Sequence, residues 1–295
     1  MAEPRIVRIY LEKSLRKSAE AGQHNFIRLM TEVLAERGYR IAYKALTPAE
    51  CAKGALRPGF SLTHMAPPLG PRGLVFRRAY HYPFWQIDQT AERWNWQVAQ
   101  VPFVPKPEPS AEVQRFFKFW RRRLFAEVKT TRAGFIYVPL QGLLTQHRSF
   151  QSCSPLEMLS AIRAARPEAR IVATLHPKER YDDTELAALR EMAARDPLLE
   201  LDTGGMEQYL PRCDLVVTQN SSVAFSGFFL EKPALLYAKI DFHHIALGPE
   251  DWHLVEAHRP DYAQYIHWYW QIMSINAGHG SAKSKITQRF DAFGW

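Results

Sequence analysis

Cysteine is scarce in this chain of 295 residues, and the three that occur, Cys51, Cys153 and Cys213, stand far apart. Because none belongs to a CxxC pair, neither a disulfide framework nor a zinc site is expected. The sequence also lacks a GxSxG turn, which argues against a serine hydrolase, and a GxGxxG fingerprint of dinucleotide binding. Any chemistry must therefore come from other polar side chains.

No apolar run is long enough to cross a membrane, and the chain does not open with a charged and then apolar leader. Residues 1–4 instead lead almost directly into a first strand. We therefore expect a cytoplasmic protein, and peripheral attachment to the inner face of a membrane stays open.

The composition is that of an ordinary globular protein, with 46% hydrophobic and 23% charged residues. The net charge of +8 favours an acidic partner, which could be nucleic acid, anionic lipid, or a substrate with phosphate or carboxylate groups. No nucleic-acid-binding motif accompanies the charge, so nucleic acid is not expected as a partner. The length fits two domains of roughly 130 to 150 residues.

Aromatic and basic residues are concentrated at one place, where residues 116–120 (FFKFW) are followed by Arg121, Arg122 and Arg123. They predict an amphipathic helix within residues 110–128. Such a helix can lie on a membrane surface. A helix packed on the protein with a solvated basic face is the alternative, and both interpretations stay open.

Predicted strands and helices alternate along both halves of the chain, which specifies parallel sheets. The first half is expected to contain a strand over 5–11, a polar loop over 12–23, a helix from His24 to Gly38, and strands over 39–46 and 62–65. The second half is expected to contain strands over 135–140, 170–175, 199–201 and 215–217, and helices over 155–165, 184–195 and 206–210. The predicted fold class is α/β, with two Rossmann-like domains that face a cleft.

The domain boundary is placed after a proline-rich segment, 102–109, and the helix that follows it. The first domain is predicted over 1–130 and the second over 131–295, with a hinge at 130–134. A helix over 260–276 is dense in aromatics and could cross back to the first domain, although a plain packing role is the more ordinary interpretation.

A short strand ends at Val217 and is followed almost at once by Asn220, Ser221 and Ser222. In a parallel α/β sheet, ligands bind at such strand ends, and backbone N–H groups that begin a helix favour an anion. These residues therefore predict a phosphate-binding site. An ordinary helix N-cap is the alternative.

A second strand, 170–175, delivers His176, Pro177 and Lys178 to the same edge of the sheet. His176 can donate to a phosphate oxygen or protonate a leaving group, Pro177 fixes the backbone, and Lys178 adds a positive charge. Gln141, in the loop after the strand over 135–140, lies at this edge too. The sequence therefore predicts one ligand site at several strand ends.

The order of these motifs over residues 135–278 resembles the capsule polysaccharide biosynthesis family, which includes Kdo transferases, and is more distantly similar to bacterial sialyltransferases. His176 and Pro177 match the HP motif, and Ser221 and Ser222 match the serine motif, which in the sialyltransferases bind the nucleotide of a CMP-sugar. The resemblance implies the two-Rossmann-domain fold called GT-B. The first half departs from the pattern, because it lacks the acidic pair before glycine that supplies the base; Asp182 and Asp183 stand in the wrong half.

An aromatic and charged segment over 77–96 is expected to bind the acceptor, because ring faces stack on sugars while charged groups fix hydroxyls. His81, Trp85 and Glu92 are the candidate acceptor-binding residues, and a packed surface is the alternative. Asp88 is the first candidate for the catalytic base or nucleophile, with His24 as another. A structural ion pair of Asp88 with a nearby arginine stays open.

The resemblance thus implies a glycosyltransferase that uses a nucleotide-activated sugar in surface or capsular polysaccharide synthesis, with a glycan or glycolipid acceptor. A CMP-sugar such as Kdo or sialic acid is favoured, because residues 223–227 lack the carboxylate with which UDP-sugar enzymes hold the ribose. No cofactor and no metal are expected, since no DxD pair occurs and the adjacent His243 and His244 usually would point apart. The alternative is a catalytically silent protein that binds nucleotide or glycan.

Overall fold

The computed structural model describes residues 4–295. The expectation that the chain opens without a leader concerns residues 1–4, and the first three of these lie outside the described residues. The chain forms two compact units. One consists of Met1–Val101 and Trp268–Trp295, and the other of Pro102–His267. Residues 102–130 therefore pack with the second unit, whereas the sequence placed them in the first.

The sheet of the first unit has the strand order β11-β5-β4-β3-β1-β2. Its strands are β1 (Ile6–Leu11), β2 (Arg40–Ala45), β3 (Phe60–His64), β4 (Gly73–Arg78), β5 (Phe84–Asp88) and β11 (Ile275–Asn276). Strands β2, β1, β3 and β4 are parallel, while β5 runs antiparallel to β4 and β11 antiparallel to β5. The carboxyl ends of β1, β3 and β4 therefore lie at the same edge of the sheet as the start of β5.

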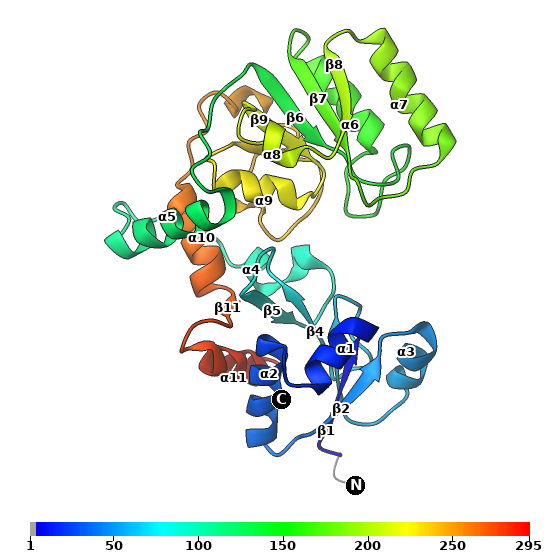
Figure 1. The fold of residues 1–295 in the computed structure, drawn as a ribbon, viewed down its shortest axis with the longest axis vertical. Coiled ribbons are helices and arrows are strands. Elements are labelled where there is room, and N and C mark those ends of the chain that lie inside the picture. Colours follow the sequence, from blue (N-terminus) through cyan, green and yellow to red (C-terminus); the bar gives the residue numbers. More distant parts are fainter. Residues whose placement is uncertain (1–3) are drawn as a thin grey trace. The chain divides into compact units, whose positions relative to one another are not determined.

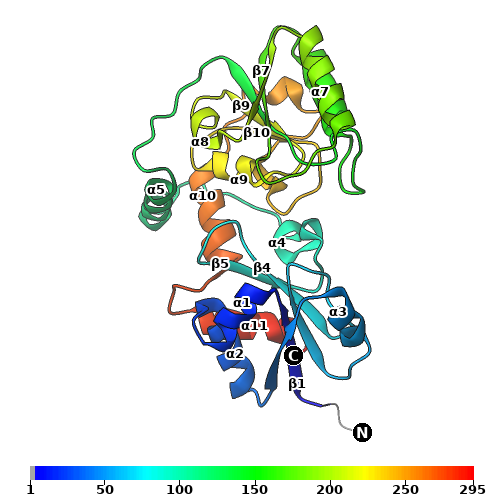
Figure 2. The ribbon, with the colours of Figure 1, turned by 45° about the vertical axis from the view of Figure 1, so that its right-hand side comes forward.

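Helices of the first unit cover this sheet. They are α1 (Lys13–Glu20), α2 (Asn25–Glu36), α3 (Pro48–Ala55), η1 (Arg93–Asn95), α4 (Gln97–Gln100) and α11 (Ala282–Ala292). The polar loop expected over 12–23 is wrong, because α1 forms there with only Ala19 buried. Helix α2 begins directly after His24, as predicted, and its apolar stripe joins the core with α11, which lies beside it in Figure 2.

The sheet of the second unit is entirely parallel, with the order β10-β9-β6-β7-β8. Figure 1 labels β6, β7, β8 and β9, and Figure 2 labels β10. Its strands are β6 (Phe135–Pro139), β7 (Arg170–Leu175), β8 (Leu199–Thr203), β9 (Leu215–Thr218) and β10 (Ala234–Leu236). The chain builds outward from β6 to β7 and β8, and then returns to place β9 on the other side of β6. The strand order thus reverses between β6 and β9, as in a doubly wound Rossmann fold.

The second unit contains helices and two 3-10 turns. The helices are α5 (Ala111–Phe125), α6 (Pro155–Ala165), α7 (Asp183–Arg195), α8 (Met206–Tyr209), α9 (Ser222–Phe228) and α10 (Tyr262–His267), and the turns are η2 (His243–Ile245) and η3 (Trp252–Leu254). Helices α5 and α10 lie side by side in both views (Figures 1 and 2).

The helix expected over 260–276 is confirmed in its central part, because α10 passes without a gap into a π-helix, η4 (Trp268–Ile272). The end of the predicted range is wrong, since the chain enters β11 at Ile275. The second unit ends at His267, and the first unit resumes at Trp268. The Lys285 ammonium donates to the carbonyls of Ile272 and Ser274 at 3.0 Å each. Lys285 therefore satisfies carbonyl groups that a continuing helix would have bonded itself.

Candidate functional site

The most favourable place for a ligand lies at the carboxyl edge of the second unit's sheet, between β6 and β9. In open α/β sheets, ligands bind outside the strand ends where the order reverses. Gln141 follows β6 there, and Asn220, Ser221 and Ser222 follow β9. The fold therefore brings together residues that lie about 80 positions apart in the sequence.

Two amide side chains at this edge have a buried oxygen without a hydrogen-bond partner, Gln141 Oε1 and Asn220 Oδ1. Asn220 is only 8% exposed. Leaving a buried polar atom unpaired costs about 1–3 kcal/mol, so native structures rarely keep such atoms without a reason. Both oxygens can accept from a hydroxyl or amino group of a ligand.

Ser221 and Ser222 differ in their surroundings. Ser221 is the N-cap of α9, and its hydroxyl accepts from the Val223 N–H at 3.3 Å, which is the structural role that the sequence left open. Ser222, the first helical residue, is exposed. Its hydroxyl is therefore the more accessible donor of the pair.

The HP loop, residues 176–178, follows the neighbouring strand β7 and is exposed. His176 Nδ1 accepts from the Lys178 N–H at 3.2 Å, which leaves the proton of a neutral ring on Nε2. The Tyr181 hydroxyl accepts from the His176 N–H at 2.9 Å and fixes the start of the loop. His176 can therefore present its Nε2–H as a donor to an anion.

The loops after β6 and β7 approach each other closely. A Cβ at Gly142 would lie 2.8 Å from Glu179 Oε2, so only glycine fits without a shift of that carboxylate. This approach places Gln141 and the loop of His176 at the same part of the edge.

A cavity of about 460 Å³ opens at the end of β10. Phe150, Gln151, Tyr237, Lys239, His243 and Gly248 are among the residues that line it. Gln151 Nε2 donates to Gln219 Oε1 at 2.6 Å, and this bond links the cavity wall to the residue before Asn220. Lys239 was not among the residues predicted for the site. It lies three residues after the buried strand β10, and a polar residue that follows a buried strand is the pattern by which His176 was predicted.

The rings of His243 and His244 stack at 4.3 Å, so the expectation that they point apart is wrong. His243 lines the cavity at β10 and its Nδ1 lies 2.8 Å from the Ile240 carbonyl oxygen. Among residues 4–295, no group of three or more His, Cys, Asp or Glu side chains is arranged to hold a metal ion.

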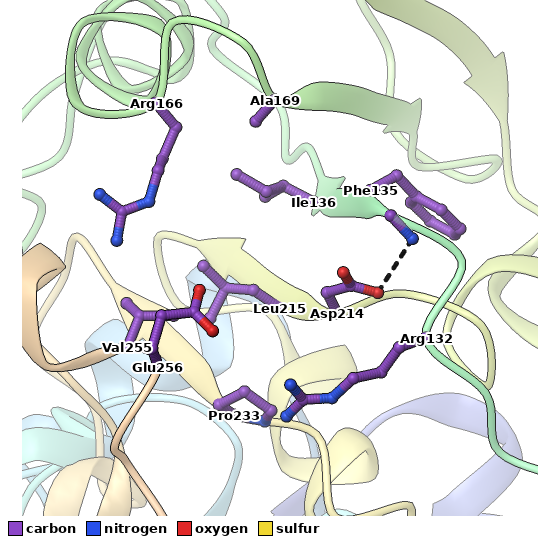
Figure 3. Close-up of a pocket in the computed structure, with 11 residues that line it drawn as sticks. Arg132, Phe135, Ile136, Arg166, Ala169, Asp214, Leu215, Pro233, Val255 and Glu256 are labelled. Atoms are coloured by element: carbon purple, nitrogen blue, oxygen red, sulfur yellow. Dashed lines mark hydrogen bonds between the residues drawn. The ribbon is translucent and has the colours of Figure 1, made fainter.

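Another cavity, of about 170 Å³, lies at the opposite, amino edge of the same sheet (Figure 3). Asp214 accepts there from the Gly134 N–H at 3.1 Å, and Arg166 donates to the Trp252 carbonyl at 2.6 Å. These two charged groups already have partners within the protein. Ligands of open α/β sheets bind outside the carboxyl ends of the strands, whereas this cavity lies at their amino ends. We therefore place the candidate site at the carboxyl edge.

Other polar residues of the motif region have structural roles. Asp182 caps α7 in a reciprocal pair with Glu185, so it does not replace the missing acidic motif. The buried Lys232, which precedes Pro233, donates to the carbonyls of Thr131 at 2.6 Å and Cys213 at 2.7 Å. It thereby ties the segment before β6 to the one before β9.

In the first unit, Asp88 is 5% exposed, and its two oxygens accept from the backbone N–H groups of Gln89 and Gln97 at 2.8 and 2.9 Å. Burial raises the pKa of this carboxyl group, while those bonds and the positive charge of Arg289 oppose the rise. These contacts favour a structural role, in which Asp88 anchors the backbone at Gln89 and Gln97. The arginine whose charge acts on Asp88 is Arg289, and not one of its sequence neighbours.

The three residues predicted to bind an acceptor differ in accessibility. Trp85 is 4% exposed and stacks on Phe26 with ring centroids 4.6 Å apart, so this face is not available to a sugar. Burial, with the charge of Arg78, lowers the pKa of His81 to about 4. Glu92 is exposed and accepts from Asn95 at 2.7 Å.

His24 caps α2, and its Nδ1 accepts from the Ile27 N–H at 3.2 Å. It lies edge-on to Trp85 with ring centroids 5.3 Å apart. At the same sheet edge, Glu12 and His64 form a pair that the sequence prediction missed. Nothing in the local sequence marks them, because the partners stand at the ends of different strands.

The two units, each built on a parallel or largely parallel sheet with helices between the strands, define the two-Rossmann-domain class of fold called GT-B. A solved structure with this fold is Thermosulfurimonas dismutans KpsC, beta Kdo 2,7 transferase. It is 14% identical, and the match covers 97% of this chain and 99% of that one with a TM-score of 0.57. This likeness confirms the predicted fold class.

Two further structures match less well. Thermosulfurimonas dismutans KpsC, beta Kdo 2,4 transferase, is 11% identical over 90% of each chain with a TM-score of 0.49. The Methanocaldococcus jannaschii UDP-GlcNAc 2-epimerase is 10% identical over 98% of this chain and 99% of its own, with a TM-score of 0.38. No protein-family model matches the sequence. A search of curated proteins found no match either.

Proposed function

We propose that this protein is a glycosyltransferase that uses a nucleotide-activated sugar in the synthesis of a surface polysaccharide. The observation that carries the proposal is the pair of unpartnered amide oxygens, Gln141 Oε1 and Asn220 Oδ1, at the point where the strand order of the second unit reverses. The similar structure of KpsC, a beta Kdo 2,7 transferase, supports the same activity. A CMP-sugar such as Kdo or sialic acid is the proposed donor.

Each residue of the edge has a role in this proposal. Gln141 and Asn220 accept from the hydroxyl or amino groups of the nucleotide. Ser222 and His176 Nε2–H donate to its phosphate, and Lys178 contributes a positive charge. His176 can also protonate the leaving phosphate, so that the transfer is proposed to need no metal ion.

The experiment is a calorimetric titration of the protein with CMP, with UMP for comparison. Asn220→Ala should weaken CMP binding by about 3-fold to 10-fold, the worth of one hydrogen bond. It should not lower the melting temperature, because it removes an unpaired buried oxygen. Ser160→Ala, an exposed serine on α6, is the matched control and should change neither quantity. CMP affinity that is unchanged in Asn220→Ala would contradict the proposed site.

A catalytically silent binding protein is the second candidate, favoured by the absence of the acidic pair before glycine. CMP release from the CMP-sugar by the wild type separates the two candidates, and His176→Ala tests the role of the histidine. A transferase should lose turnover more than donor affinity, because the histidine acts on the leaving group in the transition state. A binding protein would show CMP affinity without any release of CMP from the CMP-sugar in the wild type.

The acceptor is proposed to be a glycan or glycolipid, with α5 as a peripheral membrane contact. Phe117 and Trp120 are buried on one face of α5, whereas Phe119 is 55% exposed beside Arg122 and Arg123. None of the helices over residues 4–295 is long and apolar enough to span a membrane. An exposed ring flanked by cations suits the surface of an anionic bilayer.

A further inference from the structure

A carboxylate and an imidazole meet at the carboxyl edge of the first unit's sheet. Glu12 directly follows β1, and His64 is the last residue of the neighbouring parallel strand β3. Glu12 Oε2 lies 3.0 Å from His64 Nδ1. Glu12 is also the N-cap residue of α1, but its side chain makes no capping bond there. The carboxylate is therefore engaged with the histidine and not with its own helix.

This bond fixes the state of the His64 ring. A carboxylate only accepts hydrogen bonds, so the proton of the neutral ring lies on Nδ1 and Nε2 keeps a free lone pair. The ring packs beside Phe76 at 5.2 Å and Trp85 at 6.4 Å between centroids. The His64 side chain is 14% exposed and that of Glu12 50%, so a solute can reach the pair.

His24 has the opposite arrangement. Its Nδ1 accepts from the Ile27 N–H, so its proton lies on Nε2. Burial lowers the pKa of His24, and the charges of His64 and Arg78 act on it in the same direction. The centroids of the His24 and His64 rings lie 5.3 and 6.4 Å from that of Trp85. A fixed acceptor, His64 Nε2, and a fixed donor, His24 Nε2–H, thus belong to rings that neighbour the same indole.

We infer that His64, oriented by Glu12 and assisted by His24, forms a site that binds a sugar hydroxyl and accepts its proton. The inference rests on the proposed function, which supplies the sugar donor. As His64 Nε2 takes the proton, the acceptor oxygen forms a bond to the anomeric carbon of the donor. The bond from that carbon to the phosphate oxygen breaks, and its electron pair leaves with the nucleotide. Glu12 is a positioning residue that stabilises the resulting imidazolium.

The first test is NMR of the histidine ring nitrogens in the intact protein, with His64→Gln to assign the signals. The wild type should show the Nδ1–H form of His64, and Glu12→Ala should lose it. The matched control is Glu112→Ala, which removes a carboxylate 3.8 Å from His267 Nε2 in the second unit and should leave His64 unchanged. An Nε2–H form of His64 in the wild type would overturn the inference.

The second test adds a methyl glycoside of Kdo as the probe and follows the same signals. Shifts of both His64 and His24 that are absent in Glu12→Ala support the site, and no shift in the wild type overturns it. CMP release from CMP-Kdo should fall by about 100-fold or more in His64→Gln, with CMP affinity and melting unchanged. CMP binding without a response of His64 would refute this inference and leave the proposed function standing, whereas absence of CMP binding would refute the proposed function, on which the role of His64 in transfer rests.

Discussion

Asp88 illustrates how the same carboxylate can look catalytic in sequence and structural in the fold. Its oxygens accept from the N–H groups of Gln89 and Gln97, the second of which opens α4. Asp88→Asn keeps only one of these acceptors. We expect a loss of about 1–3 kcal/mol in the free energy of unfolding, partly offset because a buried charge disappears.

Thermal melting and CMP release measured on the same variant check this expectation. The matched control is Glu92→Gln, which changes an exposed carboxylate of the same segment and should leave the melting temperature unchanged. A stable Asp88→Asn protein that lost transfer by about 100-fold would instead restore Asp88 as the acid or base.

His81 should make the stability of the protein depend on pH. Its pKa is lowered to about 4 in the folded protein, from 6.5 as the ordinary value, so the unfolded chain binds more protons between these limits. The contribution of His81 to the free energy of unfolding is therefore complete above pH 6.5. It is lost as the pH falls toward 4, and the free energy of unfolding then decreases by up to about 3 kcal/mol. His24 acts in the same direction.

Urea unfolding at several pH values measures this slope. His81→Gln should reduce the loss of stability between pH 6.5 and 4, whereas His279→Gln, an exposed histidine of the same unit, should keep it. An identical slope in His81→Gln and the wild type would contradict the assignment.

Single residues of the candidate site were predictable where they lie within two residues of the end of a buried strand. His176 and Asn220 belong to this class, because the polar residue after an apolar run is visible locally. Glu12 and His64 do not, since their contact depends on β1 and β3 being neighbours. The burial of Trp85 under Phe26 likewise depends on packing between distant elements.

At the scale of elements, strongly periodic or apolar segments were predicted closely, as for β7 and α6. Helix α1 was missed, because its residues are nearly all polar and its apolar face contributes only Ala19 to the buried core. The end of the helical segment after η4 was misplaced for another reason. The carbonyls of Ile272 and Ser274 accept there from Lys285 of α11, a partner that lies outside the segment.

Helix α5 carries the prediction that belongs to this scale. Each cation near an anionic bilayer contributes about 1 kcal/mol, so Arg122→Ala with Arg123→Ala should weaken binding to vesicles by about 30-fold. Cosedimentation with phosphatidylglycerol and phosphatidylcholine vesicles measures this, with phosphatidylcholine alone as the reference. The control is Arg190→Ala with Arg195→Ala on α7, which are also exposed. Equal binding of both double variants would leave α5 as a packed helix with a solvated face.

At the scale of the whole molecule, the two units carry complementary chemistry on their own sheets. The second unit offers unpartnered acceptors and the exposed HP loop at its carboxyl edge. The first offers the pair of Glu12 and His64 at its carboxyl edge. The alternation of strands and helices predicts this architecture, because parallel strands bring their carboxyl ends to one edge. The antiparallel β5 and β11 could not be predicted in the same way, since β11 comes from the far end of the chain.

Hydrogen exchange over the whole chain tests where a nucleotide binds. CMP at about 100 times its dissociation constant should slow exchange by up to about 100-fold for amides that exchange when the bound region opens. We expect this protection at residues 140–142, 176–178 and 219–222, which follow β6, β7 and β9, and the same pattern in the presence of EDTA. Asn220→Ala should weaken it at all three segments together, because they serve one ligand. Protection concentrated at Arg132, Asp214 and Glu256 would move the site to the amino-edge cavity of Figure 3 and contradict the assignment.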